Sequence, residues 1–166
     1  CTHNNDDPTA SIDMKLYQSD RAPNPRRVRV FMAEKGIDFN EIEIVDLDKL
    51  LGQSDYISVH CPLNDDTHGL ICAETIAKMK KGAVYINTAR GGLQVEADLI
   101  DALQSGHLFG AGLDVFEEEP LKKNNPLLTM ENCILSSHNA FNTLEQVKNV
   151  NENTLYNLLK GLKIKK

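Results

Sequence analysis

Short apolar segments alternate with segments of helical periodicity along this chain, and the alternation restricts the folds open to it. The predicted strands span residues 15–18, 39–45, 56–59, 83–86, 108–115 and 133–135. The predicted helices span residues 26–35, 46–51, 73–80, 96–104 and 143–162. Strands and helices that alternate with short connections are typical of a parallel sheet covered by helices. The sequence therefore predicts a single α/β domain with three layers, in which a mostly parallel sheet carries helices on both faces.

Length and charge restrict the chain further. With 166 residues, 41% of them hydrophobic, it has room for one packed domain. A formal net charge of -6 argues against a nucleic-acid partner, which needs a basic surface. No apolar run is long enough to cross a bilayer, so we expect no membrane partner. Residues 1–13 are polar and show no periodicity, which predicts a disordered N-terminal arm.

The cysteines give no sign of a metal site or of a disulfide framework. Cys1, Cys61, Cys72 and Cys133 show neither C-x-x-C pairing nor the spacing of zinc ligands. Three of the four lie in or beside apolar stretches, where a cysteine usually acts as a small buried hydrophobic residue. We therefore expect no bound metal and a reduced, cytoplasmic setting.

Polar residues follow several of the predicted strands at the point where each strand ends. They are His60–Pro62, Thr88–Arg90, the acidic residues that begin at Asp114, and His138. In open parallel sheets, ligands bind at the carboxyl ends of the strands. If the sheet is parallel, all four groups meet at one edge, which makes that edge the candidate binding site.

An arginine, a carboxylate and a histidine at one edge can act together on a small acid. Arginine binds a carboxylate or a polarised carbonyl through two N–H donors. Histidine transfers protons near neutral pH, and a neighbouring carboxylate orients its ring and favours its charged form. Such a set could protonate a bound 2-oxo acid while a hydride arrives from elsewhere. For each residue alone a simpler interpretation stays open: His138 as a structural histidine, and Glu117–Glu119 as a solvated turn.

Four segments carry a resemblance to a known family. They read DYISVHCPLNDDTHGLI, MKKGAVYINTARGGLQVEADLIDALQSG, FGAGLDVFEEEP and ILSSHNAFNT. In order and spacing they resemble the nucleotide-binding domain of the D-isomer-specific 2-hydroxyacid dehydrogenases, over about residues 46–162. The resemblance implies a Rossmann-like fold, NAD as cofactor, and the reduction of a small-molecule 2-oxo acid to a D-2-hydroxy acid. Members of this family dimerise through this domain, which leaves a homodimer open here.

The resemblance also implies roles for individual residues. Arg90 falls on the arginine that binds the carboxylate and carbonyl of the substrate. Glu119, directly before a proline, falls on the catalytic glutamate, and His138 falls on the catalytic histidine that protonates the carbonyl oxygen. The residues implied to contact or line the cofactor site are Cys61, Pro62, Thr67, Thr88, Ala89 and Asp114. Asp46, at the end of a predicted strand, is either an acid for the ribose hydroxyls or the cap of the next helix.

Residues 14–45 do not fit this resemblance. A dinucleotide-binding domain opens with a strand, a G-x-G-x-x-G loop and a helix, but the corresponding stretch reads SDRAPNPRRV and the chain contains no such motif. Residues 14–45 instead resemble the first strand, helix and strand of a glutathione transferase. We therefore predict one Rossmann-like domain over residues 14–166 with a chimeric origin: residues 14–45 glutathione-transferase-like and residues 46–166 dehydrogenase-like.

Three functions follow from these observations. The first is an NAD-dependent oxidoreductase domain of the D-2-hydroxyacid dehydrogenase type, incomplete because the flanking substrate domain and the glycine-rich loop are missing. The second is a catalytically silent, chimeric or nucleotide-binding scaffold domain. The third is a glutathione-binding protein that acts through residues 14–45. The sequence leaves open whether the chain is an active enzyme.

Overall fold

The structure is a computed structural model that describes residues 15–19, 41–140 and 144–161. Its strands are β1 (Lys15–Ser19), β2 (Glu41–Val45), β3 (Tyr56–Val59), β4 (Ala83–Asn87), β5 (Leu108–Leu113) and β6 (Cys133–Leu135). Its helices are α2 (Leu47–Gln53), α3 (Ala73–Ala77), α4 (Glu96–Gln104) and α5 (Leu144–Gly161), with the 3-10 helices η1 (Gly91–Leu93) and η2 (Pro126–Thr129). The predicted arm 1–13 and the predicted helix 26–35 lie outside the described residues.

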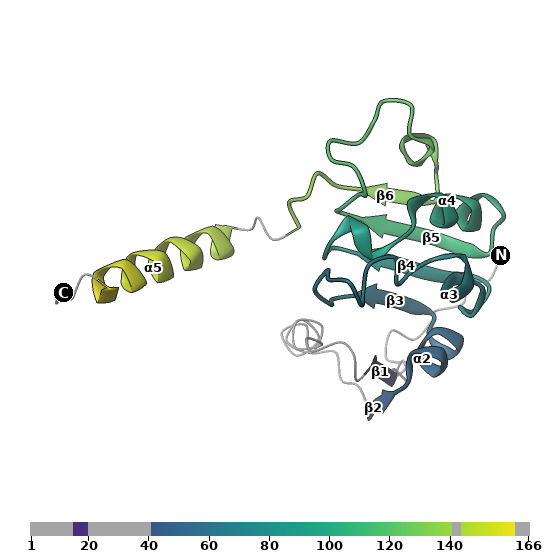
Figure 1. Cartoon of the computed structure of the whole chain (residues 1–166), viewed down its shortest axis with the longest axis horizontal. Helices are drawn as coiled ribbons and strands as arrows, with labels where there is room; N and C mark the ends of the chain where they lie inside the picture. The colour runs from purple at the N-terminus through teal and green to yellow at the C-terminus, as the bar shows by residue number, and fades with distance from the viewer. Residues whose placement is uncertain (1–14, 20–40, 141–143, 162–166) are drawn as a thin grey trace, which may run out of the picture.

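Four strands form one parallel sheet in the order β3-β4-β5-β6, which is also their order along the chain (Figure 1). β1 and β2 form a separate parallel pair. The prediction of a parallel α/β fold is confirmed for the strands that the structure describes. Because the strands of the sheet run in one direction, the loops that follow β3, β4, β5 and β6 leave from the same edge.

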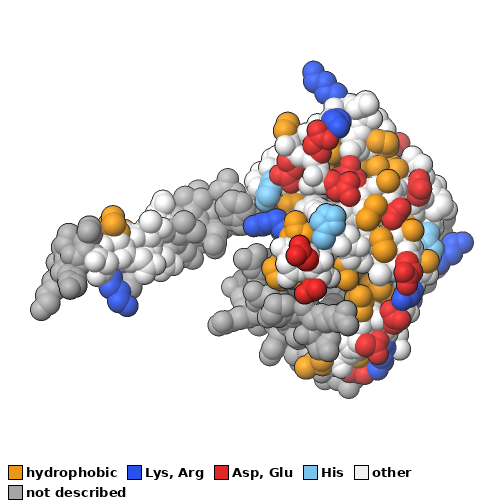
Figure 2. Space-filling model, viewed as in Figure 1, with side chains coloured by type: hydrophobic (Ala, Val, Ile, Leu, Met, Phe, Trp, Pro, Cys, Tyr) orange, Lys and Arg blue, Asp and Glu red, His pale blue; other side chains and the backbone are white. Residues whose placement is uncertain are grey.

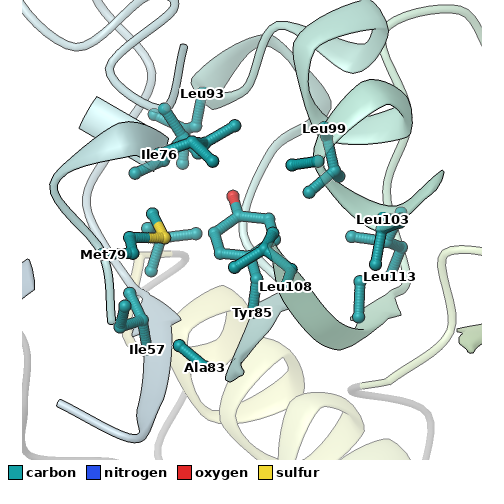
Figure 3. Packing of buried hydrophobic residues seen from close by; sticks show 14 of the residues in the cluster. Ile57, Ile76, Met79, Ala83, Tyr85, Leu93, Leu99, Leu103, Leu108 and Leu113 are labelled. Carbon is teal, nitrogen blue, oxygen red and sulfur yellow. The ribbon is translucent and has the colours of Figure 1, made fainter. Parts of the chain in front are cut away.

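One face of the four-stranded sheet carries the hydrophobic core. Alternate strand residues such as Ile57, Tyr85 and Leu113 point to this face, and Ile76 of α3 and Leu99 of α4 pack over them (Figure 3). Each such side chain stabilises the fold by about 1.5–3 kcal/mol when fully buried. Tyr85 lies in the middle of the cluster, and burial raises the pKa of its phenol. The packed layer holds the strand ends in fixed positions.

The opposite face of the sheet exposes large apolar side chains. Tyr56 is 74% exposed and Ile134 is 79% exposed. The strand register places them on the same face as Val84 and Ile86, which are half-buried. Helices α2, α3 and α4 contribute residues to the core cluster on the other side. The described helices therefore account for one of the two predicted helical layers.

Element boundaries differ from the predicted ones by a few residues, for local reasons. α3 ends at Ala77 instead of Lys80, because the N–H of Lys78 bonds back to the carbonyls of Thr75 and Ile76. The chain then reverses through Gly82, whose φ is 86°. β5 ends at Leu113, two residues earlier than predicted. The bounds of α4, β3 and β6 agree with the predictions.

Charged side chains of both signs are interspersed on the face shown in Figure 2, where acidic groups are frequent and basic groups are scattered. Exposed ion pairs contribute to this pattern, for example Lys78 with Asp48 at 3.0 Å. No helix in the described ranges is long and apolar enough to cross a membrane.

Candidate active site

The three predicted catalytic side chains line one cleft at the carboxyl edge of the sheet. Arg90 follows β4, Glu119 follows β5 and His138 follows β6. The cleft has a volume of about 400 Å³, and Leu63, His68 and Phe116 are also among the residues that line it. The convergence follows from the parallel topology, because each of the three loops leaves the same edge of the sheet. The cleft is large enough for a small organic acid.

Glu119 and His138 form a directly bonded pair. Nδ1 of His138 lies 2.8 Å from Oε2 of Glu119, and the other carboxylate oxygen accepts a hydrogen bond from the N–H of Phe116 at 3.0 Å. The hydrogen bond from His138, and then that from Phe116, hold the pKa of Glu119 below its ordinary value. An ionised carboxylate only accepts, so Nδ1 carries the proton and Nε2 is left for a molecule in the cleft.

Asp114 anchors the segment that carries His138. Its carboxylate accepts the N–H groups of Asn139 and Ala140, both at 2.9 Å, and bonds to the hydroxyl of Ser136. Burial acts to raise the pKa of Asp114, but the hydrogen bonds outweigh it and the pKa lies below its ordinary value. His138 itself has a φ of 56°, in the left-handed region that costs a residue other than glycine on the order of 1 kcal/mol. The bonds to Asp114 directly after His138 hold this conformation.

Asn87, which was not among the predicted site residues, positions the turn that presents Arg90. Asn87 is fully buried; its Nδ2 donates to the carbonyl of Arg90 at 2.9 Å and to Oε1 of Gln94 at 3.0 Å. Its Oδ1 accepts the N–H of Ala89 at 2.9 Å. In the sequence, the sign of this role was a polar residue at the end of an apolar strand. Its three bonds shape the backbone from Asn87 to Gln94.

The guanidinium of Arg90 is exposed to the cleft. Its Nη1 donates to the carbonyl of Ala89 at 2.6 Å. Within the described ranges Arg90 forms no salt bridge with a carboxylate. The guanidinium therefore has donors left for an anion that enters the cleft.

Gly91 is required by a close backbone contact. A Cβ built on Gly91 would lie 1.8 Å from the carbonyl oxygen of Phe116. At Gly92 the nearest atom to a Cβ is a methyl carbon of Leu63, at 3.0 Å. The segment after Arg90 therefore lies directly against the segment that leads to Glu119.

The residues predicted to contact the cofactor differ in how accessible they are. Cys61 is buried in the core, so its thiol is withdrawn from a ligand at the edge. The hydroxyl of Thr67 donates to the carbonyl of Pro62 at 2.6 Å, which stabilises the loop after β3. Thr88 is exposed and Ala89 is half-buried at the end of β4. The carboxylate of Asp114 is occupied by the bonds described above.

Asp46 caps a helix, which was one of its two predicted roles. Its Oδ1 accepts the N–H of Lys49 at 2.8 Å at the start of α2. Over the part of the chain that the structure describes, no group of three or more His, Cys, Asp or Glu side chains could hold a metal ion. The other predicted role of Asp46, as an acid that binds the ribose hydroxyls, stays a prediction.

Comparison with known proteins identifies the family. A family model described as "D-isomer specific 2-hydroxyacid dehydrogenase, NAD binding domain" matches residues 9–140. A hydroxypyruvate reductase of Blautia hydrogenotrophica is 40% identical over 153 residues, 92% of this chain and 44% of that protein. A glyoxylate/hydroxypyruvate reductase B of Cronobacter sakazakii is 49% identical over 117 residues, 70% of this chain and 36% of that protein.

Solved structures agree with this assignment. The holo form of D-mandelate dehydrogenase from Rhodotorula graminis matches with a TM-score of 0.73 and 36% identity, over 89% of this chain and 40% of that one. A D-lactate dehydrogenase from Sporolactobacillus matches with a TM-score of 0.75 and 28% identity, over 90% of this chain and 52% of that one. The chain thus spans about half or less of the length of these relatives.

The comparisons also bear on residues 14–45. The family model includes these residues, and the alignment with the Blautia protein must include most of them because it covers 92% of the chain. The predicted origin of residues 14–45 in a glutathione transferase therefore has no support from these comparisons. The chain belongs to the family of D-isomer specific 2-hydroxyacid dehydrogenase NAD binding domains.

Proposed function

We propose that this chain is the nucleotide-binding portion of an NAD-dependent oxidoreductase that reduces a 2-oxo acid to a D-2-hydroxy acid. The observation that carries the proposal is the convergence of Arg90, Glu119 and His138 on one cleft. The family match and the reductases among the relatives support it. Since the chain spans less than half of those two relatives, the rest of the active site would come from chain outside this sequence or from a partner.

The cleft residues divide the reaction between them. Arg90 binds the carboxylate and the carbonyl oxygen of the 2-oxo acid through its free N–H donors. NADH, when bound, supplies a hydride to the carbonyl carbon. His138 donates the proton on Nε2 to the carbonyl oxygen, and Glu119 stabilises the imidazolium that precedes this transfer. In the product, the carbonyl has become a hydroxyl, and His138 retains the proton on Nδ1.

The residues at the edge suit the nicotinamide end of the cofactor. A flat amide-bearing ring needs apolar contact and a few neutral polar groups, which Pro62, Thr88 and Ala89 offer at the ends of β3 and β4. Cys61 would contribute through its backbone, and Thr67 by holding the loop of Pro62. We propose that Asp114 acts by positioning His138, since its carboxylate is already occupied. The second carboxylate oxygen of Asp46 is the candidate contact for the ribose.

Binding of NADH and turnover test the proposal together. Nicotinamide fluorescence during a titration of the chain with NADH measures binding. The decrease in NADH absorbance with hydroxypyruvate or glyoxylate measures turnover once the rest of the active site is supplied. Arg90→Ala should weaken binding of the oxo acid by about 10²-fold, because charge-assisted hydrogen bonds contribute about 1.5–3 kcal/mol. His138→Gln should abolish turnover and leave NADH binding intact. Absence of any saturable NADH binding would contradict the proposal.

A second candidate is a nucleotide-binding domain without activity of its own. The stretch SDRAPNPRRV, which stands where a G-x-G-x-x-G motif is expected, favours it. Proline lacks the N–H that a phosphate-binding loop provides. Saturable binding of NADH without turnover, even when the rest of the active site is supplied, would support this second candidate. The comparisons give no observation that favours binding of glutathione.

We further propose one Rossmann-like domain over residues 14–166, a homodimer and a cytoplasmic setting. The match over residues 9–140 supports a single domain. The exposed Tyr56 and Ile134 support an interface on the open face of the sheet, which is the face opposite the hydrophobic core. Cys61, Cys72 and Cys133 are free thiols. Burial raises the pKa of Cys61, and that of Cys133 to about 11, as suits unreactive thiols in a reducing setting, whereas hydrogen bonds from Thr75 lower the pKa of Cys72.

A further inference from the structure

Glu96, the first residue of α4, lies outside the catalytic set and is buried, with only 9% of its surface exposed. Its Oε1 accepts a hydrogen bond from Nδ2 of Asn125 at 2.6 Å, and its Oε2 lies 3.4 Å from the N–H of Glu117. Its own N–H donates to Oε1 of Glu117 at 3.1 Å. A buried carboxylate with several hydrogen-bond partners usually has a specific structural or functional reason.

The three bonds join both ends of the loop that carries Glu119. Glu117 lies two residues before Glu119, and Asn125 begins η2 as its N-cap, with Oδ1 accepting the N–H of Leu127 at 2.9 Å. The segment from 117 to 125 is therefore fixed to the start of α4 at its beginning and at its end. Glu119 between them bonds to His138.

The location suits a carboxylate. The free N–H groups at the start of a helix carry partial positive charge, and α4 presents Glu96 and Asp98 there. The side chain of Glu117 satisfies the N–H of Glu96, while the side chain of Glu96 reaches back to the N–H of Glu117. Removal of the Glu96 carboxylate would leave Nδ2 of Asn125 and the N–H of Glu117 without these acceptors.

We propose that Glu96 is a positioning residue for the Glu119–His138 pair: by holding both ends of the 117–125 loop, it keeps Glu119 in bonding distance of Nδ1 of His138. The catalytic meaning of that pair rests on the proposed function, but the positioning itself does not. Glu96 acts through the loop and makes no contact with substrate.

The test is the proton position on His138, measured in the full chain by long-range 1H–15N NMR at a pH where the ring is neutral. In the wild-type chain Nδ1 should carry the proton, because Glu119 accepts from it. Glu96→Ala and Asn125→Asp should shift the ring toward the tautomer protonated at Nε2. Asn125→Asp keeps the acceptor for Leu127 and replaces the donor to Glu96 with a carboxylate that repels it, so it breaks the same tie and decides the question if Glu96→Ala does not fold.

Asp98→Ala is the matched control. Asp98 also lies in the first turn of α4 and also holds another segment, since its Oδ2 accepts the N–H of Ala73 at 2.7 Å. Its loss should lower the melting temperature and leave the tautomer of His138 unchanged. An unchanged tautomer in Glu96→Ala and Asn125→Asp, or an equal change in Asp98→Ala, would overturn the proposal. Neither result depends on NADH binding or turnover, so failure of the proposed function would be recognised separately.

Discussion

At the scale of single residues, Gly91 makes the most demanding contact near the cleft. Any side chain there would overlap the carbonyl of Phe116, since a Cβ would lie 1.8 Å from its oxygen. Both partners are backbone, so the overlap can be relieved only by moving the two segments apart. We expect Gly91→Ala to destabilise the fold by at least about 3 kcal/mol, at the upper end of the cost of overpacking. Urea denaturation measures the loss.

Gly92→Ala is the control for Gly91→Ala. The added methyl group would meet side-chain methyls of Leu63, which can rotate away, so the cost should stay below about 1 kcal/mol. Equal losses in the two variants would show that the backbone contact at Phe116 is not what requires glycine.

The carboxyl of Asp114 should make the segment around His138 sensitive to acid. Its pKa is lower in the folded chain than the ordinary value of about 4. A carboxyl shifted in this direction contributes stability above its unfolded pKa and loses it as the pH falls through the folded pKa. The wild-type chain should therefore have a higher melting temperature than Asp114→Asn at neutral pH, and the difference should shrink below about pH 4.

The measurement is the melting temperature of both chains from neutral pH to about pH 2, the range in which carboxyls titrate. Asp65→Asn, at an exposed position in the loop after β3, gives the background for removal of one negative charge. A difference between wild type and Asp114→Asn that stays constant through the acid range would contradict the role assigned to Asp114.

At the scale of elements, the turn from β4 into η1 depends on the amide of Asn87. In Asn87→Asp the two hydrogen bonds donated by Nδ2 are lost, and a carboxyl faces the carbonyl of Arg90 and Oε1 of Gln94. We expect a loss of about 3 kcal/mol, because a fully buried group is left without suitable partners. Thr88→Asp, one residue further at an exposed position, should cost far less in the same urea experiment.

Element prediction was accurate where local pattern and tertiary packing agree. The apolar face of α4, with Leu99 and Leu103, has helical spacing, and both residues pack into the core. The pattern over residues 73–80 also looked helical, yet α3 ends at Ala77. Met79 is nevertheless buried in the core, as the apolar spacing over residues 73–80 indicated. What the spacing could not show is that the chain reaches that position through a turn.

At the scale of the whole molecule, the open face of the sheet predicts self-association. Ile134 is 79% exposed at the middle of β6, on the same face as the exposed Tyr56, and an exposed apolar patch marks an interaction site. If a second copy covers this face, Ile134→Asp should convert a dimer to a monomer in sedimentation velocity. Leu128→Asp, at an exposed position on η2 and not on a strand of the sheet, should leave the dimer intact. A wild-type chain that stays monomeric at high concentration would contradict the homodimer.

The sequence by itself determined the alternation of strands and helices, and with it the edge at which Arg90, Glu119 and His138 gather, because a parallel sheet brings successive loops to one side. Only the tertiary structure decided the contacts among those loops. Three sets of contacts join positions about 20 residues or more apart in the chain. They are Gly91 with Phe116, Asp114 with the segment that carries His138, and Glu96 with Glu117 and Asn125. Local spacing carries no information on such pairs, because their geometry depends on how the core packs and where each loop is tied.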